Sequence, residues 1–161
     1  MEINIKNIEP SQKEYIEIGC WRVNERVNEI VRFIKLKDGH VEAYKDEKQY
    51  RIALSDILYV EAVDDRCFIY LDKDCYESRR RLYEFEDMLP AENYLRISKQ
   101  VLVNLMKIEQ IRPALNGRFL CRLSNGEDVI VSRKYVPDMK EKLRGDRRGR
   151  TSLKTCSEAS S

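Results

Sequence analysis

Residues 116–132 read NGRFLCRLSNGEDVIVS, and this stretch decides how the second half of the chain folds. It holds Asn-Gly pairs at 116–117 and 125–126, each between runs in which apolar and polar residues alternate. Asn-Gly is favoured in tight hairpin turns, because both residues adopt the left-handed backbone at little cost. Together with the run that starts at Ile108, the pattern predicts a three-stranded antiparallel meander over residues 108–132.

Upstream of the meander the patterns predict more strands and two short helices. Apolar residues at helical spacing, followed by Pro90, predict a helix over 82–89, and residues 135–143 predict a last short helix. Alternation predicts strands at 41–46, 48–53, 57–62, 67–71 and 94–98, with the first two joined as a hairpin at Asp46-Glu47. The predicted fold class is mainly β with short helices (α+β), built from small antiparallel sheets.

The first 40 residues follow another pattern. Residues 2–7 and 15–18 alternate and predict two short strands, whereas apolar residues from Trp21 onward recur every three or four positions and predict an amphipathic helix over 22–36. Gly39 is placed to end that helix. We therefore expect an N-terminal strand–strand–helix extension (1–40), a main domain (41–144) and a disordered basic and polar tail (145–161).

Composition narrows the class of protein. The chain has 161 residues, of which 42% are apolar and 36% are charged, with both signs represented. No apolar run approaches the roughly 18 residues of a membrane span, and the N-terminus lacks the apolar core of a signal peptide. We expect a cytoplasmic protein. The five cysteines form no Cys-x-x-Cys pair, which argues against a disulfide framework or a zinc site, and Cys67 and Cys121 are expected to be buried.

The charge is unevenly distributed along the chain. The net charge is +2, but residues 46–93 carry seven basic and thirteen acidic side chains, whereas residues 94–144 carry eleven basic and five acidic ones. A polyanion could therefore be bound by the second segment of a nearly neutral protein. The alternative is that these charges scatter around the fold, and the asymmetry alone does not separate the two interpretations.

Patterns typical of enzymes are not found in the sequence. The only histidine, His40, stands in a turn and is expected to be exposed, so no Ser-His or Cys-His pair can form. No glycine-rich phosphate loop follows a strand. Asp64-Asp65 and the Asp72/Asp74 pair fit turns better than a metal site, because Asp side chains accept local backbone hydrogen bonds. We expect no catalytic activity, no metal and no cofactor.

Three polar clusters interrupt or follow strong strands and are candidate binding loops. Lys and Arg side chains beside hydroxyls suit phosphate oxygens, and Arg, Lys and Gln can also read base edges. The alternative is that the clusters are ordinary solvated strand ends. The clusters are Asp64-Asp65-Arg66, Ser98-Lys99-Gln100 and Ser132-Arg133-Lys134-Tyr135.

Residues 41–144 resemble the LytTR-type DNA-binding domains of bacterial transcription regulators. The resemblance rests on these stretches, in this order: DILYVEAVDD with FIYL, RRLYEFEDMLP, YLRISKQVLVNLMKIEQI, and LNGRFLCRLSNGEDVIVSRKYVPDMKEKL. It implies an elongated arrangement of small sheets whose loops enter successive major grooves of a direct-repeat site. It implies that Lys99 and Gln100 stand on one DNA-facing loop, and Arg133 and Lys134 on another, with Ser132 suited to phosphate. Asp64 and Asp65 depart from the family pattern, which leaves Arg66 as the agent of a third contact.

The resemblance also bears on assembly. Residues 1–40 are too short for a receiver domain, so we expect a stand-alone regulator, for which the resemblance implies a membrane-protein partner. We expect the helix at 22–36 to form a homodimer through Val23, Val27, Ile30 and Ile34; packing of this face on its own domain is an equally open alternative. A second class of function is a protein-interaction module that binds an acidic or membrane-protein partner instead of DNA.

Overall fold

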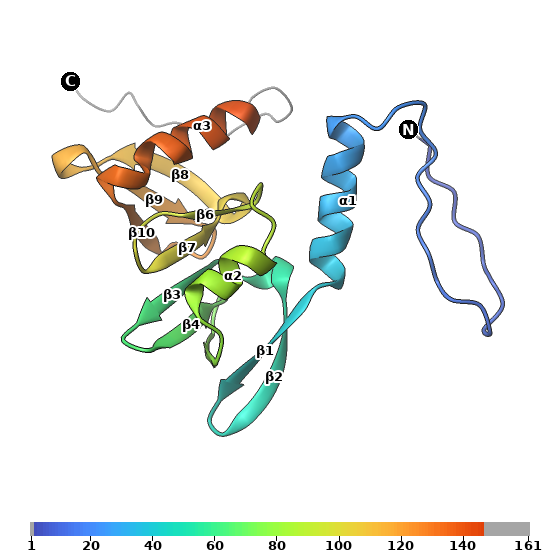
Figure 1. Cartoon of the computed structure of the whole chain (residues 1–161), viewed down its shortest axis with the longest axis horizontal. Helices are drawn as coiled ribbons and strands as arrows, with labels where there is room; N and C mark the ends of the chain where they lie inside the picture. Colours follow the sequence, from blue (N-terminus) through green and yellow to red (C-terminus); the bar gives the residue numbers. More distant parts are fainter. Residues whose placement is uncertain (1, 147–161) are drawn as a thin grey trace.

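The computed structural model describes residues 2–146, which form two antiparallel sheets and three helices (Figure 1). The helices are α1 (Glu25–Asp38), α2 (Leu82–Met88) and α3 (Val136–Asp146). The strands are β1 (His40–Lys45), β2 (Lys48–Ala53), β3 (Tyr59–Val63), β4 (Arg66–Tyr70), β5 (Cys75–Ser78), β6 (Tyr94–Arg96), β7 (Val101–Asn104), β8 (Ile108–Pro113), β9 (Phe119–Leu123) and β10 (Asp128–Val131). The larger sheet has the order β2-β1-β5-β4-β3-β7-β6 and the smaller β10-β9-β8. The predicted class, mainly β with short helices, is confirmed.

The predicted hairpins form where the sequence placed their turns. β1 pairs with β2, and Asp46 and Glu47 between them have φ of 52° and 63°. In the meander, Asn116 and Gly117 have φ of 60° and 71°, whereas the second turn spans residues 124–127 and only Gly126 is left-handed, at 87°. The meander over 108–132 is thus confirmed, and turn residues that tolerate positive φ set its corners.

Two apolar cores lie one on each side of the larger sheet's β3 and β7. The first is formed by β1 to β5 with α2, and it fully buries Ile57, Val60 and Phe85. The second joins β6 and β7 to the small sheet and α3. Cys67 lies in the first core and Cys121 in the second, exposed by 2% and 0%, so the expectation that both are buried is confirmed. Burial raises the pKa of the Cys121 thiol to about 12.

A buried hydrogen-bond network holds the end of β7. The Asn104 amide, on a residue that is 2% exposed, donates to the Ile57 carbonyl at 3.0 Å and to the Tyr94 hydroxyl at 3.3 Å. That hydroxyl in turn donates to the Leu54 carbonyl at 2.6 Å, and the amide oxygen of Asn104 accepts from the Met106 N–H at 3.0 Å. Because every polar atom named here is partnered, the network can sit in an apolar surrounding.

The prediction of two strands at 2–7 and 15–18 is wrong, because residues 2–24 contain no strand. These residues instead extend from the domain as a separate arm (Figure 1). Alternation of apolar and polar residues gives a segment the two faces of a strand, but a strand forms only where a second strand pairs with its backbone. In the described part of the chain no such partner lies beside these residues, and Ile3 and Ile5 are exposed by 84% and 91%. The predicted helix forms but begins at Glu25, because the side chain of Asn24 accepts the Val27 N–H at 3.1 Å and caps it there.

Gly39 ends α1, as predicted, but in an extended rather than a left-handed conformation, with φ of −75°. Its small size is what the fold needs: a Cβ there would lie 2.6 Å from Cδ1 of Leu54. His40 is exposed, as expected. None of the helices within residues 2–146 is long and apolar enough to cross a membrane. Most of the tail predicted to be disordered, residues 147–161, lies outside the described residues.

Candidate nucleic-acid interface

The three polar clusters predicted from the sequence lie where strands of the two sheets end. Arg66 is the first residue of β4, directly after the Asp64-Asp65 turn. Residues 98–100, here the first loop, connect β6 to β7. Residues 132–135, the second loop, follow β10 and close into a single 3-10 turn before α3.

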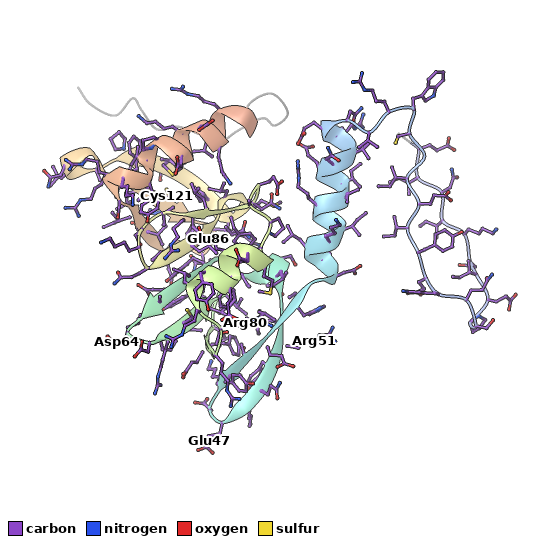
Figure 2. The ribbon with its side chains drawn as sticks, viewed as in Figure 1. Glu47, Arg51, Asp64, Arg80, Glu86 and Cys121 are labelled. Atoms are coloured by element: carbon purple, nitrogen blue, oxygen red, sulfur yellow. The ribbon has the colours of Figure 1, made fainter. Side chains whose placement is uncertain are left out.

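Backbone hydrogen bonds connect these clusters although they are far apart in sequence. The N–H of Ser132 donates to the carbonyl of Ile97 at 2.8 Å, so the second loop lies beside the first. The N–H of Ala62 donates to the carbonyl of Gln100 at 2.7 Å and ties the first loop to the β3–β4 hairpin, whose tip is marked by Asp64 in Figure 2. The structure therefore gathers the predicted site residues of all three clusters into one region.

The first loop is held rigidly by a residue that the sequence analysis did not single out. Arg96 donates from Nε to the Ser98 carbonyl at 3.3 Å and from Nη2 to the Lys99 carbonyl at 2.5 Å. Its Nη1 lies 2.8 Å from a carboxylate oxygen of Glu86 on α2. Inside the loop the Ser98 hydroxyl accepts the Gln100 N–H at 3.2 Å. Two contacts from one guanidinium thus hold the loop's backbone, and a third anchors that guanidinium to α2.

The side chains at the tips of both loops point to solvent. Lys99, Gln100, Arg133 and Lys134 are exposed, and no acidic side chain of residues 2–144 lies within ion-pairing distance of the three cations. The ammonium of Lys134 lies 5.6 Å from the ring centroid of half-buried Tyr135. This arrangement leaves several cationic groups un-neutralised on a rigid surface.

The β8–β9 turn also reaches this region. Gly117 has a φ of 71°, and a Cβ there would lie 3.1 Å from Cδ of Arg133, so the stem of Arg133 lies across the turn. The adjacent Arg118 is exposed. From the sequence, Asn116-Gly117 is predicted only as a hairpin turn, because nothing in the spacing signals that it touches a loop two strands further along the chain.

The third cluster differs from the first two, because the charges of Asp65 and Arg66 are paired with side chains from outside the cluster. Nη1 of Arg66 lies 3.5 Å from a carboxylate oxygen of Glu77. Arg81 donates to the Asp65 carbonyl at 2.9 Å and lies 3.4 Å from its carboxylate. The Arg66 side chain is still 68% exposed. No group of three His, Cys, Asp or Glu side chains in the described part of the chain could hold a metal ion.

Comparison with known proteins relates the chain to a family of DNA-binding domains. A family model described as the LytTr DNA-binding domain matches residues 47–144. Sensory transduction protein LytT of Enterococcus faecalis is 33% identical over 98 residues, which are 61% of this chain but only 40% of that protein. An uncharacterized HTH-type transcriptional regulator of Staphylococcus aureus is 27% identical over 145 residues, or 89% of this chain and 98% of that protein. Within residues 2–146 strands separate the three helices, so no helix-turn-helix pair is present there.

A solved structure shares the fold. The LytTr DNA-binding domain of a Bacillus cereus protein superposes with a TM-score of 0.63 and 26% identity, covering 66% of this chain and 97% of that one. The family model and the structural neighbour each cover more than half of the chain, and the range matched by the family model includes both loops and the meander. The chain therefore belongs to the LytTR family of DNA-binding domains.

Proposed function

We propose that this protein is a sequence-specific transcriptional regulator that inserts loops into successive major grooves of a direct-repeat DNA site. The observation that carries the proposal is the hydrogen bond from the Ser132 N–H to the Ile97 carbonyl, which joins the bases of the two cationic loops. The proposal is supported by membership in a family of DNA-binding domains rather than enzymes and by a relative named as a transcriptional regulator.

The candidate residues divide into two roles. Lys99, Gln100, Arg133 and Lys134 stand on exposed tips, where Arg and Lys can read guanine and Gln can read adenine. Contacts to the DNA backbone phosphates are assigned to residues that are half-buried or already ion-paired. Such contacts position a protein on DNA without reading its sequence. These residues are Ser98, Ser132 and Arg66. Tyr135 is assigned a supporting role, because its ring lies next to the ammonium of Lys134.

A direct-repeat site binds two domains, so the proposal includes a homodimer on DNA, acting in the cytoplasm. The helix face expected to form that dimer is partly used inside the chain: Val27 is buried, and Ile30 and Ile34 are half-buried. Only Val23, at 65%, is largely exposed. A membrane-protein regulator stays a prediction from the family resemblance.

Retention on DNA tests the proposal against the second candidate, a module that binds an acidic protein through the same cations. The wild type is expected to stay on a labelled pool of random duplexes at about 0.15 M salt, where exposed charges more than roughly 8 Å apart are screened. Complete loss of binding at that salt, with a folded protein, would favour the interaction module.

A further inference from the structure

The arm, residues 2–24, presents an unusual amount of apolar surface. Trp21 is the only tryptophan of the chain and is fully exposed, at 108% of its reference area. Tyr15 and Ile16 are each exposed by 68%. Large exposed apolar residues that cluster on one segment mark an interaction site rather than a solvated surface. The arm of 23 residues also matches the roughly 20–30 residues that one partner contributes to a stable protein interface.

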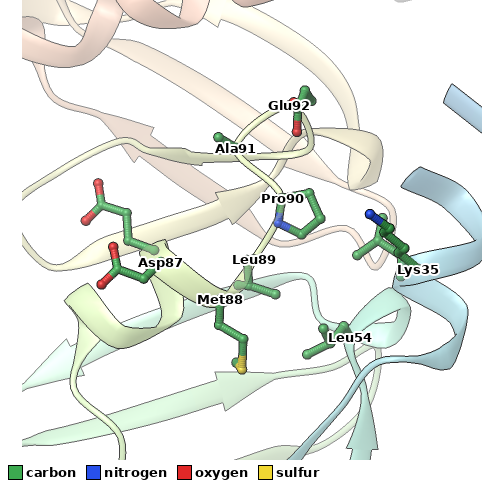
Figure 3. Close-up of a pocket in the computed structure, with 10 residues that line it drawn as sticks. Lys35, Leu54, Asp87, Met88, Leu89, Pro90, Ala91 and Glu92 are labelled. Atoms are coloured by element: carbon green, nitrogen blue, oxygen red, sulfur yellow. The ribbon is translucent and has the colours of Figure 1, made fainter. Parts of the chain in front are cut away.

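The domain offers a hollow of about 540 Å³ between α1 and the segment that connects α2 to β6 (Figure 3). Its apolar wall includes Leu54, Met88 and Leu89. Its rim carries three carboxylates, those of Glu86, Asp87 and Glu92, against the single ammonium of Lys35. A concave site with an apolar wall and a charged rim suits one large amphipathic side chain.

The charges of arm and hollow are complementary. Arg22 follows Trp21 directly and has no acidic partner among the side chains of residues 2–144. On the rim, Glu86 pairs with Arg96, whereas Asp87 has no basic partner in the same part of the chain. Trp and Arg are the residue types most often found at the energetic centre of an interface.

The backbone of Trp21 does not reach the hollow of its own chain. From Asn24 to the level of Lys35 the helix rises about 16 Å, at roughly 1.5 Å per residue. The backbone from Trp21 to Asn24 spans at most about 10 Å when extended. The backbone of Trp21 could therefore reach the height of Lys35 in its own chain only if α1 unwound. The hollow is open to the arm of another copy.

We propose that Trp21 of one copy fills the hollow of a second copy, with Arg22 facing Asp87, and that the two copies exchange arms reciprocally. In a two-fold dimer the same contact is made twice, so each docked indole adds to the stability of the dimer. The inference does not depend on DNA binding, because arm, hollow and test belong to the DNA-free protein. Failure here would leave the proposed function intact.

Because Trp21 is the only tryptophan, its fluorescence reports on the contact directly. The full chain is diluted from high to low micromolar concentration, with its mass followed by sedimentation. We expect the emission to shift to the blue and to become protected from acrylamide quenching as dimer forms. A monomer at every concentration, a dimer whose indole stays exposed, or a protected indole in the monomer each overturns the proposal.

Variants locate the contact. Trp21→Ala should weaken the dimer by at least about 30-fold, as a hot-spot residue does, without changing the melting temperature of the monomer, because the side chain is fully exposed. Arg22→Glu and Asp87→Arg should each weaken it, and their combination should restore it. Tyr83→Ala, an exposed aromatic on α2 outside the hollow, is the matched control. Single reversals that leave the dimer unchanged would contradict the docking of Arg22 at Asp87.

Discussion

Arg96 on β6 and Glu86 on α2 form an ion pair of 2.8 Å, and the same guanidinium also binds the carbonyls of Ser98 and Lys99. Through this pair a helix of the first core fixes the backbone of the first loop. In the proposed function Arg96 is therefore a positioning residue, whose effect on DNA binding would pass through the loop that it holds.

Arg96→Ala should lower DNA affinity roughly tenfold or more, because charged hydrogen bonds of this kind contribute about 1.5–3 kcal/mol each. Arg96→Lys should not restore binding, since an ammonium cannot make the forked contacts. Affinity is measured by fluorescence anisotropy, and amide exchange of residues 98–100 shows whether the loop loosens. Arg122→Ala removes another paired arginine, on β9, and serves as the control. Full binding by the Lys variant would refute the positioning role.

Lys99→Ala and Lys134→Ala should each weaken DNA binding without lowering the melting temperature, because both side chains are exposed. A lost phosphate contact should flatten the log–log salt dependence by about one. A lost base contact should cost roughly 1–3 kcal/mol and relax specificity at one position. Lys73→Ala, in the β4–β5 turn, is the matched control. Unfolding of either loop variant would show that its lysine is structural.

Asn104→Ala should destabilise the fold by roughly 2–4 kcal/mol, because it leaves buried partners of its amide without hydrogen bonds. Urea unfolding followed by circular dichroism measures the loss. Asn28→Ala, at an exposed position of α1, should change stability by less than about 0.5 kcal/mol. Equal stability of the two variants would mean that the Asn104 network contributes little.

Substitutions of three glycines by alanine distinguish two causes of lost stability, the steric overlap of the added Cβ with a neighbour and the strain of a positive φ. Gly39→Ala should cost roughly 1–3 kcal/mol, since its Cβ would overlap Leu54. Gly126→Ala should cost about 1 kcal/mol through its φ of 87° alone, because no atom lies within 4 Å of the added Cβ. Gly19→Ala meets nothing within 4 Å and should be neutral. Thermal unfolding ranks the three, and a neutral Gly39→Ala would contradict the close packing of Leu54.

Thiol labelling of the native protein should follow burial. Cys20 is exposed and should react readily at neutral pH. Cys67 and Cys121 should react only on unfolding, because both are buried and burial raises the pKa of each thiol. Mass spectrometry of labelled peptides measures each site. Rapid native labelling of Cys121 would show that the second core opens readily.

The sequence predicted what is local and missed what is distant. The meander and its turns follow from Asn-Gly and alternation, and α2 follows from helical spacing before Pro90. The arm shows the limit of that logic, because alternation in residues 2–7 could not reveal that no strand lies beside them. The contacts that build the site join Ser132 to Ile97 and Glu86 to Arg96, and no periodicity reports on such pairs. The side chains to test could be named from the sequence, but their alignment into one surface could not.

The most direct test of the central claim is a selection of bound sequences from random duplex DNA at physiological salt. The wild type is run beside the Lys99→Ala/Lys134→Ala double variant, and the folding of both is verified by circular dichroism. The wild type is expected to enrich a repeated motif, and the folded variant is expected not to. No enrichment by the wild type, or the same motif from both proteins, would contradict sequence reading by these two loops.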